Sequence, residues 1–144
     1  MNLGELLAEG GEQGGQVALG GALAFAGIAH LTKARQEFQA QVPSWVPLDP
    51  DTVVVASGVV EITLGTALLA VHTKRARPAL GWLVAAFFIA VFPGNISQLV
   101  TRTDAFGLNS DLLRIVRLPF QPLLVLVSLW STGAWKTWRA SRSS

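Results

Sequence analysis

The sequence predicts an all-α integral membrane protein, a bundle of four helices that crosses the bilayer up-down-up-down as a single domain over residues 1–144. Three observations predict this class. Four runs are uncharged or nearly so and reach about 20 residues, the length that a helix needs to cross the hydrocarbon core of a bilayer. Only 14% of the residues are charged, against about 25% in soluble domains. Mean hydropathy is +0.46, so a soluble fold would lack polar surface.

Each of the four expected spans should be a helix, because unpaired backbone groups are too costly in lipid. The first span, residues 14–31, is rich in Gly and Ala. The second, residues 52–71, is interrupted only by Glu61. The third covers residues 78–100 and the fourth residues 118–135, and neither contains a charged side chain.

Small residues and one proline refine this plan of helices. Pro93 is expected to kink the third span by removing a backbone hydrogen bond. Small residues in the first two spans are expected to allow close helix packing. They are Gly20, Gly21, Ala24, Gly27, Gly58 and Gly65.

Both ends of the chain lie outside the expected spans. Near the N-terminus, Leu3, Leu6 and Leu7 could form one or two amphipathic turns on the membrane surface, or belong to a frayed terminus. Residues 138–144 are expected to be a short solvated tail.

The distribution of basic residues predicts the orientation. Cytoplasmic connections carry an excess of Lys and Arg, so both termini are expected to be cytoplasmic, in a bacterial cell membrane. Six Lys and Arg residues lie on the predicted cytoplasmic side and five on the opposite side. The six are Lys74, Arg75, Arg77, Lys136, Arg139 and Arg142, and the opposing five are Lys33, Arg35, Arg102, Arg114 and Arg117.

Several kinds of site are excluded by composition. The chain has no cysteine, so it forms no disulfide and no thiolate metal site. We therefore expect no metal and no covalently attached cofactor. The basic residues are scattered, whereas a nucleic-acid-binding surface needs a clustered basic face, so no nucleic acid is expected as a partner.

Glu61 is the most informative residue, because it lies near the middle of the second span. A carboxylate at that depth costs at least ~2.5 kcal/mol, and such residues face the bundle interior and mark functional sites by default. The alternative is a structural tie, in which Glu61 is hydrogen-bonded to a neighbouring helix.

Other polar residues fall in the outer half of the bilayer when each helix is given a rise of about 1.5 Å per residue. His30 lies near the outer end of the first span, Asn95 in the outer third of the third span, and Arg117 and Gln121 at the outer end of the fourth. We infer a polar-lined pocket that opens outward, with Glu61 at its floor. Each residue also has a simpler interpretation: His30 at the headgroups, Asn95 as an interhelical hydrogen bond, and Arg117 snorkelling to phosphates.

The connection between the first two spans is rich in proline. Residues 38–50 contain three prolines, which stiffen the backbone. This segment could lie on the membrane surface as a lid over the pocket, with Phe38 and Trp45 dipping into the interface. The alternative is a simple interfacial connector.

The order and spacing of several motifs, from about residue 17 to 138, resemble the DoxX-like family of small four-helix membrane proteins. One departure is Gly94, where many relatives have Ala, and we expect it to matter little. The motifs are Ala26-Gly27-Ile28-Ala29-His30, Phe38, Val42-Pro43-Ser44-Trp45-Val46-Pro47, Ser57-Gly58-Val59-Val60-Glu61, Thr73-Lys74-Arg75, Val91-Phe92-Pro93-Gly94-Asn95 and Arg117-Leu118-Pro119-Phe120-Gln121.

The resemblance implies a link to membrane redox systems, including quinone-linked ones, and some relatives act as assembly chaperones. The positions that match the family are those of the depth argument: His30, Glu61, Asn95, Arg117 and Gln121.

Three functions follow as hypotheses. The first is an accessory subunit of a membrane redox system that binds a lipophilic molecule, a quinone, through Asn95, Arg117, Gln121, Trp45 and Phe38. It would work beside a redox partner protein, and a homo-oligomer is also considered. The second is a cofactor-independent isomerase, cyclase or hydrolase for a hydrophobic substrate. Because burial disfavours the charged form of a carboxyl group, Glu61 would be its general acid, with His30 as the counterpart. The third is an assembly factor for other membrane proteins.

Overall fold

A computed structural model describes residues 1–32, 35–39, 41–102, 104, 108 and 110–144 of the protein. In these ranges the chain forms helices and no β-strand. The four long elements are α1 (Leu3–Leu31), α3 (Pro50–Ala70), α4 (Arg77–Thr101), and α5 (Asp111–Arg117) continued by α6 (Phe120–Ser131). The short helices are α2 (Arg35–Gln39) and α7 (Ala134–Arg142).

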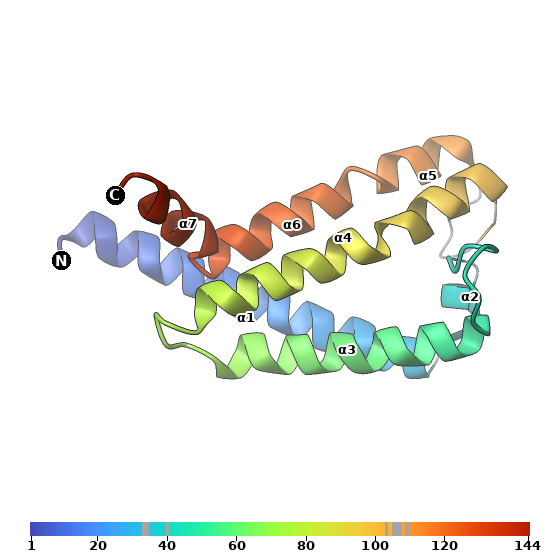
Figure 1. Cartoon of the computed structure of the whole chain (residues 1–144), viewed down its shortest axis with the longest axis horizontal. Helices are drawn as coiled ribbons and strands as arrows, with labels where there is room; N and C mark the ends of the chain where they lie inside the picture. The colour runs from blue at the N-terminus through green and yellow to red at the C-terminus, as the bar shows by residue number, and fades with distance from the viewer. Residues whose placement is uncertain (33–34, 40, 103, 105–107, 109) are drawn as a thin grey trace.

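The four long elements form an all-α membrane bundle, as the composition predicts. Each is long and apolar enough to cross a bilayer, with α5 and α6 counted together. Successive spans run in opposite directions, so both termini lie at one end of the bundle and α2 lies at the other (Figure 1). The fold class is therefore confirmed. Lys33, which entered the charge count for orientation, lies outside the described residues.

Two spans differ from their expected limits. Helix α1 begins at Leu3 rather than near residue 14, because Asn2 and Glu5 form a capping box and Glu12 pairs with Lys136. The fourth span starts at Asp111, because the charge of Arg114 is paired with Asp104 and Asp111 and so does not end the helix.

The C-terminal end of the fourth span also differs from the expectation. The helix ends near Ser131, and Gly133 follows with φ of 74°, a left-handed conformation that glycine adopts readily. Helix α7 then runs to Arg142. The tail expected at residues 138–144 is exposed but mostly helical, and the ring of Trp138 lies against that of Trp135, with centroids 5.0 Å apart and planes inclined by 31°.

Helices α1 and α3 pack closely through glycines. A β-carbon at Gly27 would lie 2.7 Å from the carbonyl oxygen of Gly58, and one at Gly65 would lie 2.5 Å from the backbone nitrogen of Ala24. Such spacing leaves no room for a side chain, which confirms the close packing expected of these positions. Gly21 is an exception, because open space surrounds its missing β-carbon.

The hydrophobic core lies where the two helix pairs meet, and it consists of Leu19, Leu23, Leu68, Leu80, Val84 and Phe88. Toward α2, the α1–α3 pair and the α4–α6 pair diverge (Figure 1). A cavity lies in this diverging half, between the two pairs.

A buried polar network ties four helices together at the end that carries the termini. Arg77 donates from Nε to Oε1 of Gln16 at 2.7 Å and from Nη2 to the carbonyl oxygen of Ser131 at 2.6 Å. Gln16 in turn donates to the carbonyl oxygens of Leu68 and Val71 at the end of α3. These bonds satisfy carbonyl groups that a helix end leaves unpaired. Arg77, expected in a basic connection, is therefore a buried structural residue.

Candidate functional site

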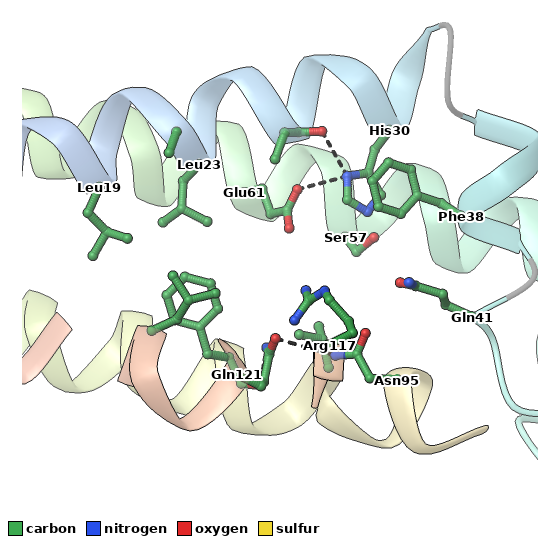
Figure 2. A pocket seen from close by; sticks show the side chains of 15 residues that line it. Leu19, Leu23, His30, Phe38, Gln41, Ser57, Glu61, Asn95, Arg117 and Gln121 are labelled. Carbon is green, nitrogen blue, oxygen red and sulfur yellow. Dashed lines mark hydrogen bonds and ion pairs between the residues drawn. The ribbon is translucent and has the colours of Figure 1, made fainter. Parts of the chain in front are cut away.

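A cavity of about 290 Å³ lies between the α1–α3 pair and the α4–α6 pair. Figure 2 shows polar side chains facing each other across it, with Leu19 and Leu23 farther along the bundle. Six of the seven site residues predicted from the sequence line this cavity: His30, Phe38, Glu61, Asn95, Arg117 and Gln121. The exception is Trp45.

His30 and Glu61 form the wall on the α1–α3 side, and each side chain belongs to a residue that is only 8% exposed. Nδ1 of His30 lies 2.8 Å from Oε2 of Glu61 and 2.8 Å from the carbonyl oxygen of Ala26. Both neighbours are hydrogen-bond acceptors, so Nδ1 carries a hydrogen. That hydrogen points to Ala26, because Oε2 of Glu61 is buried near Nδ1 without a directed hydrogen bond. The carboxyl group is thus close to the imidazole but retains unused acceptor capacity.

The position of His30 depends on Gly58. A β-carbon at Gly58 would lie 2.8 Å from the Cβ of His30. Gly58 also lies almost one turn before Glu61 on α3, so the helix surface beside the carboxyl group is flat. Helix α1 can then bring His30 directly against α3.

Phe38 covers the other side of the His30 ring. The two ring centroids are 3.3 Å apart and the rings are inclined by 16°. Phe38 belongs to α2, which is tied to α3 because Arg35 donates from Nε to Asp51 at 2.7 Å. Stacking and this exposed ion pair together restrict the imidazole on its outer side.

The opposite wall is formed by amides of α4 and α6. Gln121 donates from Nε2 to the carbonyl oxygen of Phe88 at 2.8 Å, so its Oε1 faces Asn95. Asn95 donates from Nδ2 to that Oε1 at 3.3 Å, and its Oδ1 is buried without a partner among the described residues. The backbone of Phe88 therefore sets the orientation of both amides, and a free acceptor results.

Arg117 adds a cation with a buried N–H donor to the same wall. Its Nη1 is buried and has no hydrogen-bond partner in the part of the chain that the structure describes. Figure 2 shows its guanidinium between Asn95 and the His30–Glu61 pair. Arg117 and Gln121 are four residues apart and would share one face of a continuous helix. The chain instead turns at Leu118 and Pro119, yet both side chains line the cavity.

Comparison with known families assigns the chain to one of them. A family model described as a domain of unknown function, DUF8561, matches residues 19–132. The chain belongs to the DUF8561 family. No curated protein and no solved structure matches it. The matched residues include every part of the cavity described above, and the resemblance to DoxX-like proteins remains a prediction.

The proline-rich connection of this DUF8561 protein lies against α4. A β-carbon at Gly94 would lie 2.6 Å from the carbonyl oxygen of Gln41, and Gln41 donates from Nε2 to Oε1 of Gln98 at 3.2 Å. The expectation that Gly94 matters little is therefore wrong for this chain, because alanine would push the connection away. The connection also encloses a second chamber of about 190 Å³, where Trp45 is found, 73% exposed.

Sequence reasoning missed several residues that line the cavity. Ser57 precedes Glu61 by four residues and so shares its helical face, a signal that was available. Gln41 gave no such signal, because its place depends on how the connection folds back. In the described residues, no three His, Asp or Glu side chains gather closely enough to hold a metal ion.

Proposed function

We propose that this DUF8561 protein binds a lipophilic small molecule, a quinone or its quinol, as an accessory subunit of a membrane redox system. One observation supports this most: unpaired hydrogen-bonding groups on two helix pairs face each other across a cavity within the bilayer-spanning part of the fold (Figure 2). Buried polar groups without partners are costly, so a ligand that pairs with them would be bound favourably.

The polar groups suit the two oxygens of a quinone ring. Arg117 offers a buried N–H donor to a carbonyl oxygen, and Glu61 offers an acceptor to a hydroxyl group of the reduced form. The flat rings of Phe38 and Phe88 line the same cavity and could contact a planar ring.

A route for a hydrophobic tail adjoins the cavity. Leu19, Leu23 and Leu124 line its apolar part. Gln121 also lines a nearly wholly apolar groove of about 320 Å³ between α4 and α6, with Ile89, Phe92 and Leu126. An isoprenoid tail could follow this groove into lipid.

The link to a redox system rests on the resemblance to DoxX-like proteins. The sequence contains no haem ligand pair, iron–sulfur motif or nucleotide-binding fingerprint. Electrons would therefore be exchanged between the quinone and a partner protein. We further propose that both termini face the cytoplasm of a bacterial cell, which is supported by the basic connection 72–77 and helix α7 lying at the end of the termini (Figure 1).

The proposal can be tested by extracting the purified protein. The protein is isolated from its native membrane in mild detergent, and the solvent extract is examined by ultraviolet spectroscopy before and after borohydride reduction. We expect about one quinone per chain, and much less in Glu61→Gln and Arg117→Met. Glu12→Gln is a matched control, because Glu12 is 5% exposed but lies at the other end of the bundle. A protein that retains no quinone under conditions that preserve its fold would contradict the proposal.

The contact between His30 and Glu61 also favours a second function. A carboxyl group 2.8 Å from an imidazole nitrogen could move a proton in an isomerisation, cyclisation or hydrolysis of a hydrophobic substrate. This enzyme would turn over components of a membrane lipid extract, detected by mass spectrometry. Glu61→Gln would then abolish turnover while the bound substrate is retained, whereas loss of retention alone would favour the binding function.

A further inference from the structure

The buried unpaired groups of the cavity include more hydrogen-bond acceptors than donors. Two deeply buried side chains present acceptors: Asn95, 6% exposed, through Oδ1, and Glu61, 8% exposed, through its carboxylate. One side chain, Arg117, presents a free donor. A head group that pairs with all three buried atoms therefore donates at two points and accepts at one.

The two acceptors lie on opposite walls. Glu61 belongs to the α1–α3 side, and Asn95 belongs to the α4 side, next to Arg117 (Figure 2). A ring with two para hydroxyl groups points its O–H groups in opposite directions. One hydroxyl could donate to Glu61, while the other donates to Asn95 and accepts from Arg117.

The acceptor character of Asn95 cannot be reversed by turning its amide. The carbonyl oxygen of Phe88 accepts from Gln121 Nε2 at 2.8 Å, which leaves Gln121 Oε1 to face Asn95. If Asn95 were turned, two amide oxygens would face each other, so Nδ2 stays toward Gln121. Oε2 of Glu61 lies 2.8 Å from Nδ1 of His30, and because Nδ1 already carries a hydrogen, Oε2 cannot donate to it and faces it as an acceptor.

We propose that the cavity selects the reduced form of its ligand, a lipophilic para-quinol, over the oxidised quinone. This inference rests on the proposed function and goes beyond it. A quinone has only acceptor oxygens, so it would leave the acceptors of Asn95 and Glu61 buried and unpaired. An unpaired buried acceptor costs more than the net gain of an ordinary hydrogen bond, so the difference should be at least about tenfold in affinity.

The test compares three probes with the same decyl tail on a benzene ring: the quinone, the quinol, and the quinol dimethyl ether. The ether keeps both oxygens but has no O–H group, so it separates the need for donors from the redox state. Dissociation constants are measured with the full chain in nanodiscs, without oxygen. We expect the quinol to bind at least about tenfold more tightly than either other probe.

Two variants provide the second part of the binding experiment. Glu61→Gln adds an N–H donor where the carboxylate was, so the quinol-to-quinone preference should fall several-fold. Glu12→Gln, at the far end of the bundle, should keep the preference of the natural protein. Equal or tighter binding of the quinone, or equal binding of the ether, by the natural protein would overturn this inference and leave the proposed function intact. Binding of none of the probes by the folded protein would overturn both.

Discussion

Gly58 lies so close to His30 that a β-carbon at position 58 would be 2.8 Å from the Cβ of His30. This contact joins α1 to α3 at the cavity, and it holds the imidazole beside Glu61 on the same helix as Gly58. Packing and site geometry are therefore coupled at one backbone position.

Gly58→Ala is expected to destabilise the protein and to separate His30 from Glu61. The added methyl group has no space, because its three nearest neighbours all belong to the facing helix α1, and overpacking typically costs about 1–3 kcal/mol. Thermal unfolding in detergent, followed by circular dichroism, measures the loss. Gly21→Ala is the control, since that site is open. Equal melting temperatures for the two variants would refute the prediction.

Gly94→Ala is expected to displace the connection from α4, to which it contributes Gln41, a residue that lines the cavity. The methyl group would meet the carbonyl oxygen of Gln41, which belongs to backbone and cannot move alone. Hydrogen exchange of the backbone amides from residue 41 to 49 should become faster, and ligand retention should decrease. Gly11→Ala, at a position with open space, should leave both unchanged. Unaltered exchange in Gly94→Ala would show that the connection tolerates the methyl group.

Arg77→Met is expected to weaken the bundle at the end of the termini. The substitution leaves Oε1 of Gln16 and the carbonyl oxygen of Ser131 buried without their donor. Unsatisfied buried groups cost about 1–3 kcal/mol each, so the loss of a donor to two of them should lower the unfolding free energy by about 2–6 kcal/mol. Arg75→Met changes an exposed arginine of the same connection and should have little effect. Similar stabilities of the two variants would contradict the buried network.

Arg117→Met is expected to raise stability while it abolishes ligand retention. Its Nη1 is buried without a partner, so removal of the cation should stabilise the ligand-free protein by about 1 kcal/mol. Arg114→Met provides the opposite case, because Arg114 is buried and paired with Asp104 and Asp111, and its loss removes both ion pairs. Thermal unfolding and quinone extraction of both variants provide the measurement. A less stable Arg117→Met would show that Arg117 is structural.

Much of the candidate site could be anticipated from depth along each helix. Counting residues predicts His30 and Asn95 in the outer half of the bilayer with Glu61 at the floor of the pocket, and the structure places all three on one cavity. Depth follows from the rise of a helix, which does not depend on neighbours. Trp45 was grouped with them because it lies in the same connection as Phe38, but it lines the adjoining chamber.

The remaining features depend on how the helices are rotated and on how the connection folds back. Whether Gln16 and Arg77 meet cannot be read from residues that lie far apart in the chain. The close approach of the Gln41 backbone to Gly94 likewise cannot be read from the sequence.

Taken alone, the sequence determined the class of protein, the approximate limits of its spans and the depth of its buried acid, because length, hydropathy and helical rise are local properties. The tertiary structure alone decided which atoms of the site remain unpaired. Asn95 presents an oxygen to the cavity because Gln121 is oriented by the backbone of Phe88. Such an orientation arises from contacts between helices, and no local pattern in the chain encodes it.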